Sequence, residues 1–329
     1  MSSLASAAPV LPASPYGPVA ATARDAACPE HPVTLRCGPC PDGAGRRDRV
    51  RVAAITYGTL RSLKHVSFRA PRDPSRSDLG MYYYEPRVSV LSRPSFSEPD
   101  HLPVHWIGDS SDGERLAEFA GRLCYMSQKN PASRTTADYL ENIKKQAHGS
   151  VLEHANYSVL LEGVSRSLTH ELVRHRAGFA YSQLSQRYVD ESVADFVVPP
   201  AVIGDEALEA VWKDQMASAQ QCYVALVGQL MERYAWVDDR VHRRKMAREA
   251  ARGVLPNSTE TKIVATANIR AWRSMLELRS GEGAEAEIRR LAIVIIRIMK
   301  QEAPAFFSDF DVFMAEDQRE AARAEYHKV

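Results

Sequence analysis

The chain has 329 residues, of which 45% are apolar and 25% charged, as in ordinary globular proteins. It carries 42 Lys and Arg against 41 Asp and Glu, so a net charge of +1 gives no overall attraction to nucleic acid or membranes. No apolar run approaches the roughly 20 residues of a membrane span. The first twenty residues lack Lys and Arg, and Pro9, Pro12 and Pro15 interrupt their apolar stretch, which argues against a secretory signal. We therefore expect a cytoplasmic protein.

The amino-terminal part differs in composition from the rest of the chain. Residues 1–49 are rich in Ala, Pro, Ser and Gly and show little periodicity, which indicates disorder. Residues 50–60 could form a strand, but the sequence then turns polar and basic. We therefore divide the chain into an extension over 1–85 and a domain over 86–329.

Five cysteines do not form a disulfide framework at this length. Cys124 and Cys222 lie on apparently amphipathic helices and are predicted to be core residues. The remaining cysteines and a histidine have spacings that could hold zinc: Cys28, His31, Cys37 and Cys40. A proline-rich arm with scattered cysteines is the preferred interpretation, so no metal site is predicted.

The ordered elements follow from hydrophobic periodicity and helix-capping residues. Helices are predicted over 112–126, 135–147, 165–174, 205–234, 239–252, 268–279 and 284–302, and strands over 86–92, 154–163, 195–199 and 262–267. Helices interleaved with few strands favour an α+β fold over a parallel α/β sheet. The chain has neither a Gly-x-Gly-x-x-Gly motif nor a Walker motif, so a nucleotide or flavin would need another kind of site.

The most informative stretch is Arg174-His175-Arg176, followed closely by Ser182-Gln183-Leu184-Ser185-Gln186-Arg187. Adjacent cations repel one another unless solvent or an anion compensates them. Arg side chains match phosphate oxygens in pairs, and Ser and Gln can complete the hydrogen-bond shell. The preceding helix has Ser165 as a plausible N-cap. Because Ala177-Gly178 breaks that helix, the rest of the motif is predicted to lie in a loop.

This stretch resembles the signature of the flavin-dependent thymidylate synthases (the ThyX family), which is Arg-His-Arg followed by seven residues and a Ser. Here eight residues, 177–184, precede Ser185. Three further blocks follow the family order: His148 to His154, Arg243 to Pro256, and Asn268 to Arg273 with Arg279 and the run Glu287 to Arg290. The resemblance covers roughly residues 86–311, and four ordered blocks are far more specific than one motif.

The resemblance implies a ThyX-like α+β fold, with a central mixed or antiparallel sheet and helices. It also implies an obligate homo-oligomer, a homotetramer whose active sites are shared among subunits. The implied reaction is C5-methylation of a uridine monophosphate. In that reaction methylenetetrahydrofolate supplies the carbon, reduced FAD donates hydride, and NADPH reduces the flavin again.

The resemblance also implies roles for individual residues. Arg279 would stabilise charge developing on the N3 and O4 side of the uracil, and the family counterpart of His148 is linked to catalysis. The flavin would contact Ser150, Arg174, His175, Arg176, Gln183, Asn268 and Arg270. The nucleotide would contact Glu171, Arg174, Gln183, Leu184, Ser185, Gln186, Arg187, Arg252 and Arg279, with Arg252 coming from another subunit. Ser274 stands where relatives often carry a His, and we assign it no role.

General chemistry agrees with an Arg-based mechanism. The alternative way to activate C5 is a Cys nucleophile, and neither Cys124 nor Cys222 has the electropositive setting that a reactive thiol needs. Arg stays charged and suits the stabilisation of a developing anion.

The extra residue bears on the choice between substrates. One residue moves a loop by up to about 3.5 Å, comparable to the room that a 2′-hydroxyl needs. The chain looks like a family branch from nucleoside-antibiotic pathways that methylates UMP as well as dUMP, and we predict UMP as a substrate. The alternative is a housekeeping thymidylate synthase specific for dUMP.

A remote alternative is a non-enzymatic nucleic-acid-binding protein that uses the basic helix Arg240–Arg252 and the cysteine-rich arm. The net charge near zero and the missing aromatic residues among the cations argue against this alternative.

Overall fold

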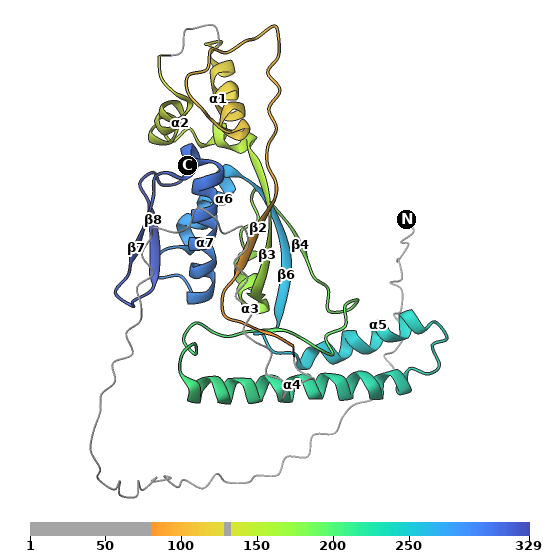
Figure 1. The fold of residues 1–329 in the computed structure, drawn as a ribbon. Coiled ribbons are helices and arrows are strands. Elements are labelled where there is room, and N and C mark those ends of the chain that lie inside the picture. The colour runs from red at the N-terminus through yellow and green to blue at the C-terminus, as the bar shows by residue number, and fades with distance from the viewer. Residues whose placement is uncertain (1–79, 128–132) are drawn as a thin grey trace, which may run out of the picture. The chain divides into compact units, whose positions relative to one another are not determined.

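The computed structural model of the chain describes residues 80–127 and 133–329 (Figure 1). The strand expected over 50–60 and the cysteines of the predicted arm lie outside these residues. None of the helices in the described ranges combines the length and apolar character that a membrane crossing requires.

A four-stranded sheet with the order β2-β3-β6-β4 lies at the centre of the described fold. Its strands are β2 (Arg87–Ser92), β3 (Asn156–Ser165), β4 (Phe179–Gln183) and β6 (Glu260–Asn268). Every neighbouring pair is antiparallel. Tyr157, Val159 and Leu161 of β3 are buried because alternate side chains of a strand point to the same face. The predicted mixture of helices with an antiparallel sheet is confirmed.

All seven predicted helices are present, with ends within two residues of the predicted ones. They are α1 (Asp112–Cys124), α2 (Thr136–Lys145), α3 (Arg166–Leu172), α4 (Glu206–Arg233), α5 (Arg240–Ala251), α6 (Ile269–Arg279) and α7 (Ala286–Glu302). Capping explains several starts: Ser111 with Glu114 and Thr135 with Asp138 form capping boxes on α1 and α2. Ser165 caps α3, as the sequence predicts.

Several short elements were not predicted. They are β1 (Tyr82–Tyr83), the 3₁₀ helices η2 (Gly149–His154) and η3 (Arg252–Val254), α8 (Pro304–Phe307), and the hairpin of β7 (Phe310–Met314) and β8 (Glu320–Ala324). The strand predicted over 195–199 is reduced to β5 (Phe196–Val197), which pairs with β1 in parallel. The sequence of β8, Glu-Ala-Ala-Arg-Ala, favours a helix by intrinsic propensity, so its pairing with β7 overrides a local preference.

One large hydrophobic cluster joins the sheet to α6, α7 and α8. Trp272 and Leu276 of α6, Ile295 of α7, and Phe306 and Phe307 of α8 are all almost fully buried in it. Figure 1 shows α6 and α7 beside the sheet, while α4 and α5 lie side by side across its end. The main core therefore lies between the sheet and the carboxy-terminal helices.

The prediction that Cys124 and Cys222 are core residues is wrong, because both are exposed. On α4 the same predicted apolar stripe faces outward, with Leu208 50% and Val211 72% exposed. Periodicity shows that one side of a helix is apolar, but it does not show which surface covers that side.

A buried ionic cluster fastens α6 to α2 and to the segment before β7. Asp309 accepts two hydrogen bonds of 2.8 Å from Arg273 and one of 2.9 Å from Lys144. All three side chains are almost fully buried. Burial opposes ionisation of Asp309, but the hydrogen bonds and charges of Arg273 and Lys144 outweigh it and lower its pKa to about 2.

We expect Asp309→Asn to lower the free energy of unfolding by about 3–5 kcal/mol, because two buried cations lose their anion. Since the pKa of Asp309 lies below the ordinary 3.8, its contribution is present above that pH and is lost as the pH falls towards about 2. Urea unfolding at pH 7 measures the loss. Asp311→Asn is the matched control, because Asp311 forms an exposed pair with Arg323 that contributes about 1 kcal/mol or less. Equal losses in the two variants would contradict the role of the cluster.

Candidate active site

The Arg-His-Arg motif lies between α3 and β4. The helix ends at Leu172, so Arg174 and His175 follow it in a tight turn, with their N–H groups donating to the carbonyls of Glu171 at 3.2 Å and Leu172 at 3.1 Å. The hydroxyl of Tyr181, on β4, lies 2.9 Å from the carbonyls of both Leu172 and His175. The helix end is thereby tied to the sheet, and His175 is held half-buried between them.

The prediction of a loop after Ala177-Gly178 is wrong, because residues 179–183 form strand β4. All five residues of β4 pair with β6 in continuous register. The turn before the strand uses Gly178 with φ +76, and a Cβ there would lie 2.8 Å from Cβ of Ala271 and 3.0 Å from the Asn268 amide. The eight residues between Arg176 and Ser185 are thus the turn at Ala177-Gly178, which is pressed against the start of α6, the five residues of β4, and Leu184.

Arg279 is the last residue of α6, and it reaches back to the end of α3. Its Nε donates to Nε2 of His175 at 3.0 Å, and its Nη1 donates to Glu171 at 2.7 Å. Burial, and then the charge of Arg279, lower the pKa of His175. The structure therefore brings together three residues that the sequence predicts for the site, from α6, from α3 and from the turn that follows α3.

The segment after β4 carries the residues predicted to hold the phosphate. The Leu184 N–H donates to the Lys262 carbonyl at 2.9 Å, which continues the β6 pairing, and the Ser185 hydroxyl accepts from the Arg187 N–H at 3.4 Å. The side chain of Gln186 is buried, and its Nε2 has no hydrogen-bond partner among the described residues. Arg187 pairs with Glu249 of α5 at 2.6 Å.

Two residues near this segment were not predicted. Arg166 donates from Nη2 to the Leu184 carbonyl at 2.8 Å, and its pKa is lowered first by burial and also by the nearby charge of Arg252. Burial raises the pKa of Glu191 to about 7, although Arg166 opposes this rise. Arg166 follows the N-cap Ser165, but nothing in the local sequence indicates that it contacts the segment predicted to bind the phosphate.

The residues predicted to hold the flavin lie around the start of α6. Asn268 is the N-cap of α6, and Gly149 of η2 packs so closely against Arg270 that a Cβ on it would lie 2.8 Å from the Arg270 Nε. Arg270 also pairs with Glu153 at 2.6 Å. His148 and Ser150, at the start of η2, are exposed. The amino end of a helix and an exposed Arg favour an anionic group, so these residues suit a phosphate-bearing cofactor.

The two halves of the predicted site are separated by the length of α6. Asn268 and Arg270 lie at its start and Arg279 at its end, and its 11 residues span about 16 Å. Gln183, predicted for both ligands, instead donates to the hydroxyls of Thr169 at 3.1 Å and Thr261 at 3.3 Å, on the helix-covered side of the sheet. In the part of the chain that the structure describes, His148 has no hydrogen bond to Arg279 or His175.

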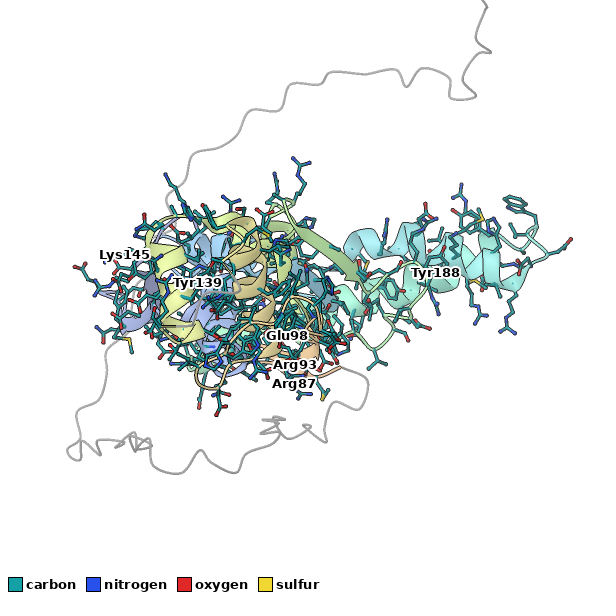
Figure 2. The ribbon with its side chains drawn as sticks, turned by 90° about the horizontal axis from the view of Figure 1, so that it is seen from above. Arg87, Arg93, Glu98, Tyr139, Lys145 and Tyr188 are labelled. Carbon is teal, nitrogen blue, oxygen red and sulfur yellow. The ribbon has the colours of Figure 1, made fainter. Side chains whose placement is uncertain are left out.

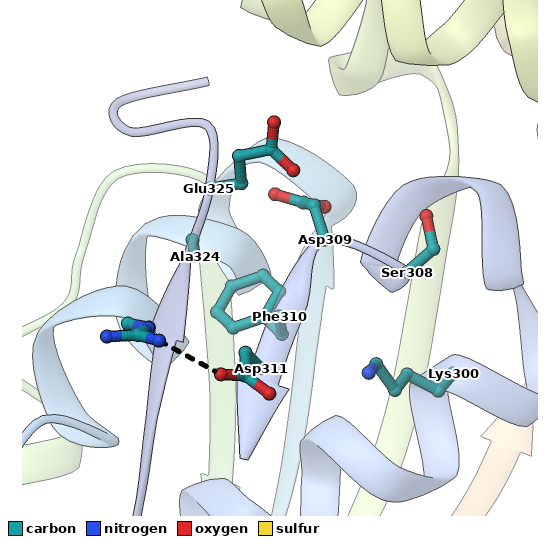
Figure 3. A pocket seen from close by; sticks show the side chains of 8 residues that line it. Lys300, Ser308, Asp309, Phe310, Asp311, Ala324 and Glu325 are labelled. Carbon is teal, nitrogen blue, oxygen red and sulfur yellow. Dashed lines mark hydrogen bonds and ion pairs between the residues drawn. The ribbon is translucent and has the colours of Figure 1, made fainter. Parts of the chain in front are cut away.

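Tyr188 lies beside α5, away from the other side chains labelled in Figure 2. The Lys245 ammonium lies 5.0 Å from the centre of its ring. A hollow of about 410 Å³ lies between α7 and the β7-β8 hairpin, and none of the predicted site residues line it (Figure 3). Within the described ranges no group of three or more His, Cys, Asp or Glu side chains could hold a metal ion.

Comparison with known proteins identifies the family of the chain. Residues 107–305 match the model of the thymidylate synthase complementing protein family. The chain is 46% identical over 242 residues to the flavin-dependent thymidylate synthase of Mycobacterium sp. (strain JLS), which covers 72% of this chain and 94% of that protein. The enzyme of that name from Mycobacterium tuberculosis (strain ATCC 25177 / H37Ra) is 46% identical over 238 residues, with the same coverage. The chain therefore belongs to this family.

A solved structure gives the same fold at lower sequence similarity. The UMP/dUMP methylase PolB from Streptomyces cacaoi, bound with 5-Br dUMP, superposes with a TM-score of 0.51 at 20% identity. The match covers 69% of this chain and 95% of PolB. At this identity the likeness concerns the fold alone.

We expect Gly178→Ala to lower the free energy of unfolding by about 2–4 kcal/mol, because positive φ is unfavourable for Ala and its Cβ would collide with α6. Gly204→Ala is the control, since φ is +85 there but nothing lies within 4 Å of a Cβ, and about 1–2 kcal/mol is expected. Urea unfolding compares the two variants. Equal losses would show that the start of α6 yields to the added methyl group without cost.

Proposed function

We propose that the protein is a flavin-dependent methylase that places a methyl group on C5 of uridine monophosphates. The observation that carries this proposal is Arg279, fixed by Glu171 and His175 directly beside the Arg-His-Arg motif. Methylenetetrahydrofolate is the proposed carbon donor, reduced FAD the hydride donor, and NADPH the reductant of the flavin. Membership of the family supports this chemistry.

In the proposed site Arg279 stabilises negative charge that develops on the uracil when C5 becomes nucleophilic. A guanidinium cannot lose its proton in a protein, so its charge persists throughout the reaction. Two hydrogen bonds to neighbouring side chains restrict its orientation before the nucleotide arrives. His148, at the start of η2, is proposed to take part in catalysis.

The nucleotide phosphate is proposed to lie at Ser185, Gln186 and Arg187, with Arg174 beside them. Gln186 supports this position because its buried amide nitrogen has no partner within the described residues. Arg252 is proposed to complete the phosphate site from another subunit. Glu171, Gln183 and Leu184 are proposed to contact the rest of the nucleotide.

The flavin is proposed to lie across Ser150, Asn268 and Arg270 and to reach Arg174, His175, Arg176 and Gln183. Arg174 and Arg176 are exposed and have no carboxylate partner among the described residues, so their charge is available to an anionic ligand. When bound, the flavin supplies the hydride. The role of the protein is to orient the two ligands along α6.

Two candidate substrate preferences remain, and each has support. The extra residue in the Ala177-Gly178 turn favours a methylase that accepts UMP as well as dUMP, and would suit a role in nucleoside-antibiotic synthesis. The 46% identity to flavin-dependent thymidylate synthases favours the alternative, a housekeeping enzyme specific for dUMP. We propose UMP turnover because the turn is the feature that departs from the family signature.

Turnover of UMP and dUMP, measured in parallel with FAD, NADPH and methylenetetrahydrofolate, tests the function. We expect methylated product from both, and deletion of Ala177 should lower the UMP-to-dUMP ratio of kcat/KM about 10-fold, or about 1.4 kcal/mol. Since dUMP is measured on the same preparation, general damage to the enzyme cancels in the ratio. Product from dUMP alone would favour the thymidylate synthase. An unchanged ratio would contradict the role of the turn, and no product with no bound flavin would contradict the function.

The proposed enzyme is a homotetramer with shared active sites. The support from this chain is the exposed apolar stripe of α4, where Leu208 is 50% and Val211 72% exposed and Cys222 is exposed as well. Apolar side chains gathered in this way mark an interaction surface.

We expect Val211→Asp to reduce the molar mass measured by light scattering from four chains to fewer, because a carboxylate would be buried at the interface. Met314→Asp is the matched control, since Met314 is 60% exposed on β7, away from α4 and α5. A tetramer that survives Val211→Asp, or a wild-type monomer, would contradict this assembly.

A further inference from the structure

The hydrogen bond between Arg279 and His175 fixes the protonation of the imidazole. Arg279 can only donate, because a guanidinium has no acceptor and keeps its proton at accessible pH. Its Nε lies 3.0 Å from Nε2 of His175, so that nitrogen must offer a lone pair. A neutral imidazole carries its single proton on the other nitrogen, Nδ1.

His175 is held at its backbone carbonyl, and its ring lies near an aromatic side chain of β4. Its carbonyl accepts from the Tyr181 hydroxyl at 2.9 Å, and its ring lies 6.4 Å from that of Phe179. Phe179 in turn packs edge-on against Trp272 of α6, with ring centres 4.9 Å apart. These contacts fix the backbone of His175 and place an aromatic ring beside its imidazole.

The charges around the imidazole are few. Arg279 faces it from α6, and Glu171 from α3 bonds the same guanidinium on Nη1. The neighbours on β4, Phe179 and Tyr181, carry no charge near neutral pH. The third nitrogen of Arg279, Nη2, has no hydrogen-bond partner among the described residues.

We propose that His175 is a positioning residue that acts as a neutral, Nδ1-protonated imidazole, holding Arg279 jointly with Glu171 so that Nη2 is presented to the carbonyl of a uracil. This inference rests on the proposed function and deepens it. Two residues align the Arg279 guanidinium: His175 accepts a hydrogen bond from Nε, and the Glu171 carboxylate accepts one from Nη1. With Glu171 alone, the Arg279 guanidinium would be held at Nη1 but could still rotate about that single hydrogen bond.

The arrangement makes the alignment depend on pH. A protonated His175 would have a donor on both nitrogens and a positive charge facing Arg279, so the hydrogen bond could not form. Burial and Arg279 lower the pKa of His175 below the ordinary 6.5, which keeps the neutral form at physiological pH. Alignment is therefore present above that pH and is lost as the pH falls through the lowered pKa.

Calorimetric binding of UMP and dUMP to the flavin-loaded enzyme at pH 8 and pH 5 tests the proposal. The nucleotide phosphate itself titrates near pH 6, so each variant is compared with the wild type at both values. His175→Gln can still accept from Arg279 but does not titrate. We expect the wild-type Kd to rise about 10-fold more than that of His175→Gln on acidification. Tyr181→Phe is the matched control, because it removes the bond to the His175 carbonyl and leaves the ring bond, and it should follow the wild type.

Equal pH dependence in the wild type and His175→Gln would overturn the proposal. Failure of the wild type to bind either nucleotide at pH 8 would instead overturn the proposed function, so the two failures are distinct. Nitrogen NMR of histidine-labelled wild-type protein gives a reading that does not depend on the variants folding. We expect one histidine that is unprotonated at Nε2, protonated at Nδ1, and changed by Arg279→Lys. An Nε2-protonated ring at pH 7.5 would overturn the proposal.

Discussion

Helix α6 sets the distance between the two halves of the proposed active site. Its first turn, with Asn268 as N-cap and Arg270, borders the proposed flavin position, and its last residue is Arg279. Since a helix rises a fixed 1.5 Å per residue, this separation changes little as long as the helix is intact. The inward face of α6 carries Trp272 and Leu276, both buried against the sheet and α7. The geometry of the site is thus fixed by the same residues that form the core.

The buried ionic cluster has a consequence for this arrangement. Arg273 lies halfway along α6 and is bound to Asp309, which also binds Lys144 of α2. Helix α2 leads directly into η2, where His148 and Ser150 lie. One buried carboxylate therefore fixes both α6 and the helix that delivers the η2 residues. Loss of the Asp309 carboxylate would disturb the residues at the proposed flavin position and would also lower the free energy of unfolding.

Much of the fold could be predicted from the sequence because the residues that start a helix lie next to it in the chain. Ser165 and Asn268 cap their helices with side-chain oxygens, as their types and positions indicate. Strand β4 was missed for the opposite reason. Its sequence, Phe-Ala-Tyr-Ser-Gln, is short and forms a strand only because β6 pairs with it. A similar limit applies to Arg166, whose contact with Leu184 joins residues 18 positions apart.

The missed strand changes how the extra residue of the motif is to be understood. Were the motif a loop, an added residue could shift everything between His175 and Ser185. With the extra residue proposed in the Ala177-Gly178 turn, the continuous register of β4 with β6 would confine the shift to that turn. An effect of the extra residue on the preference between UMP and dUMP would then arise from the turn at Gly178 and its contact with the start of α6. A one-residue slip inside β4 would turn Tyr181 away from His175, which the fold resists.

Carboxylate partners offset the repulsion among the arginines of the proposed site. Arg187, Arg270 and Arg279 each have a carboxylate partner, namely Glu249, Glu153 and Glu171. The first two pairs are partly exposed, so their attraction is weak, and a phosphate with more charge can replace the carboxylate at small cost. The third pair is less exposed and has a second bond, to His175. The proposed site therefore combines two arginines in exposed ion pairs with one that is held by two bonds, as the proposed capture of ligands and stabilisation of charge on the uracil would require.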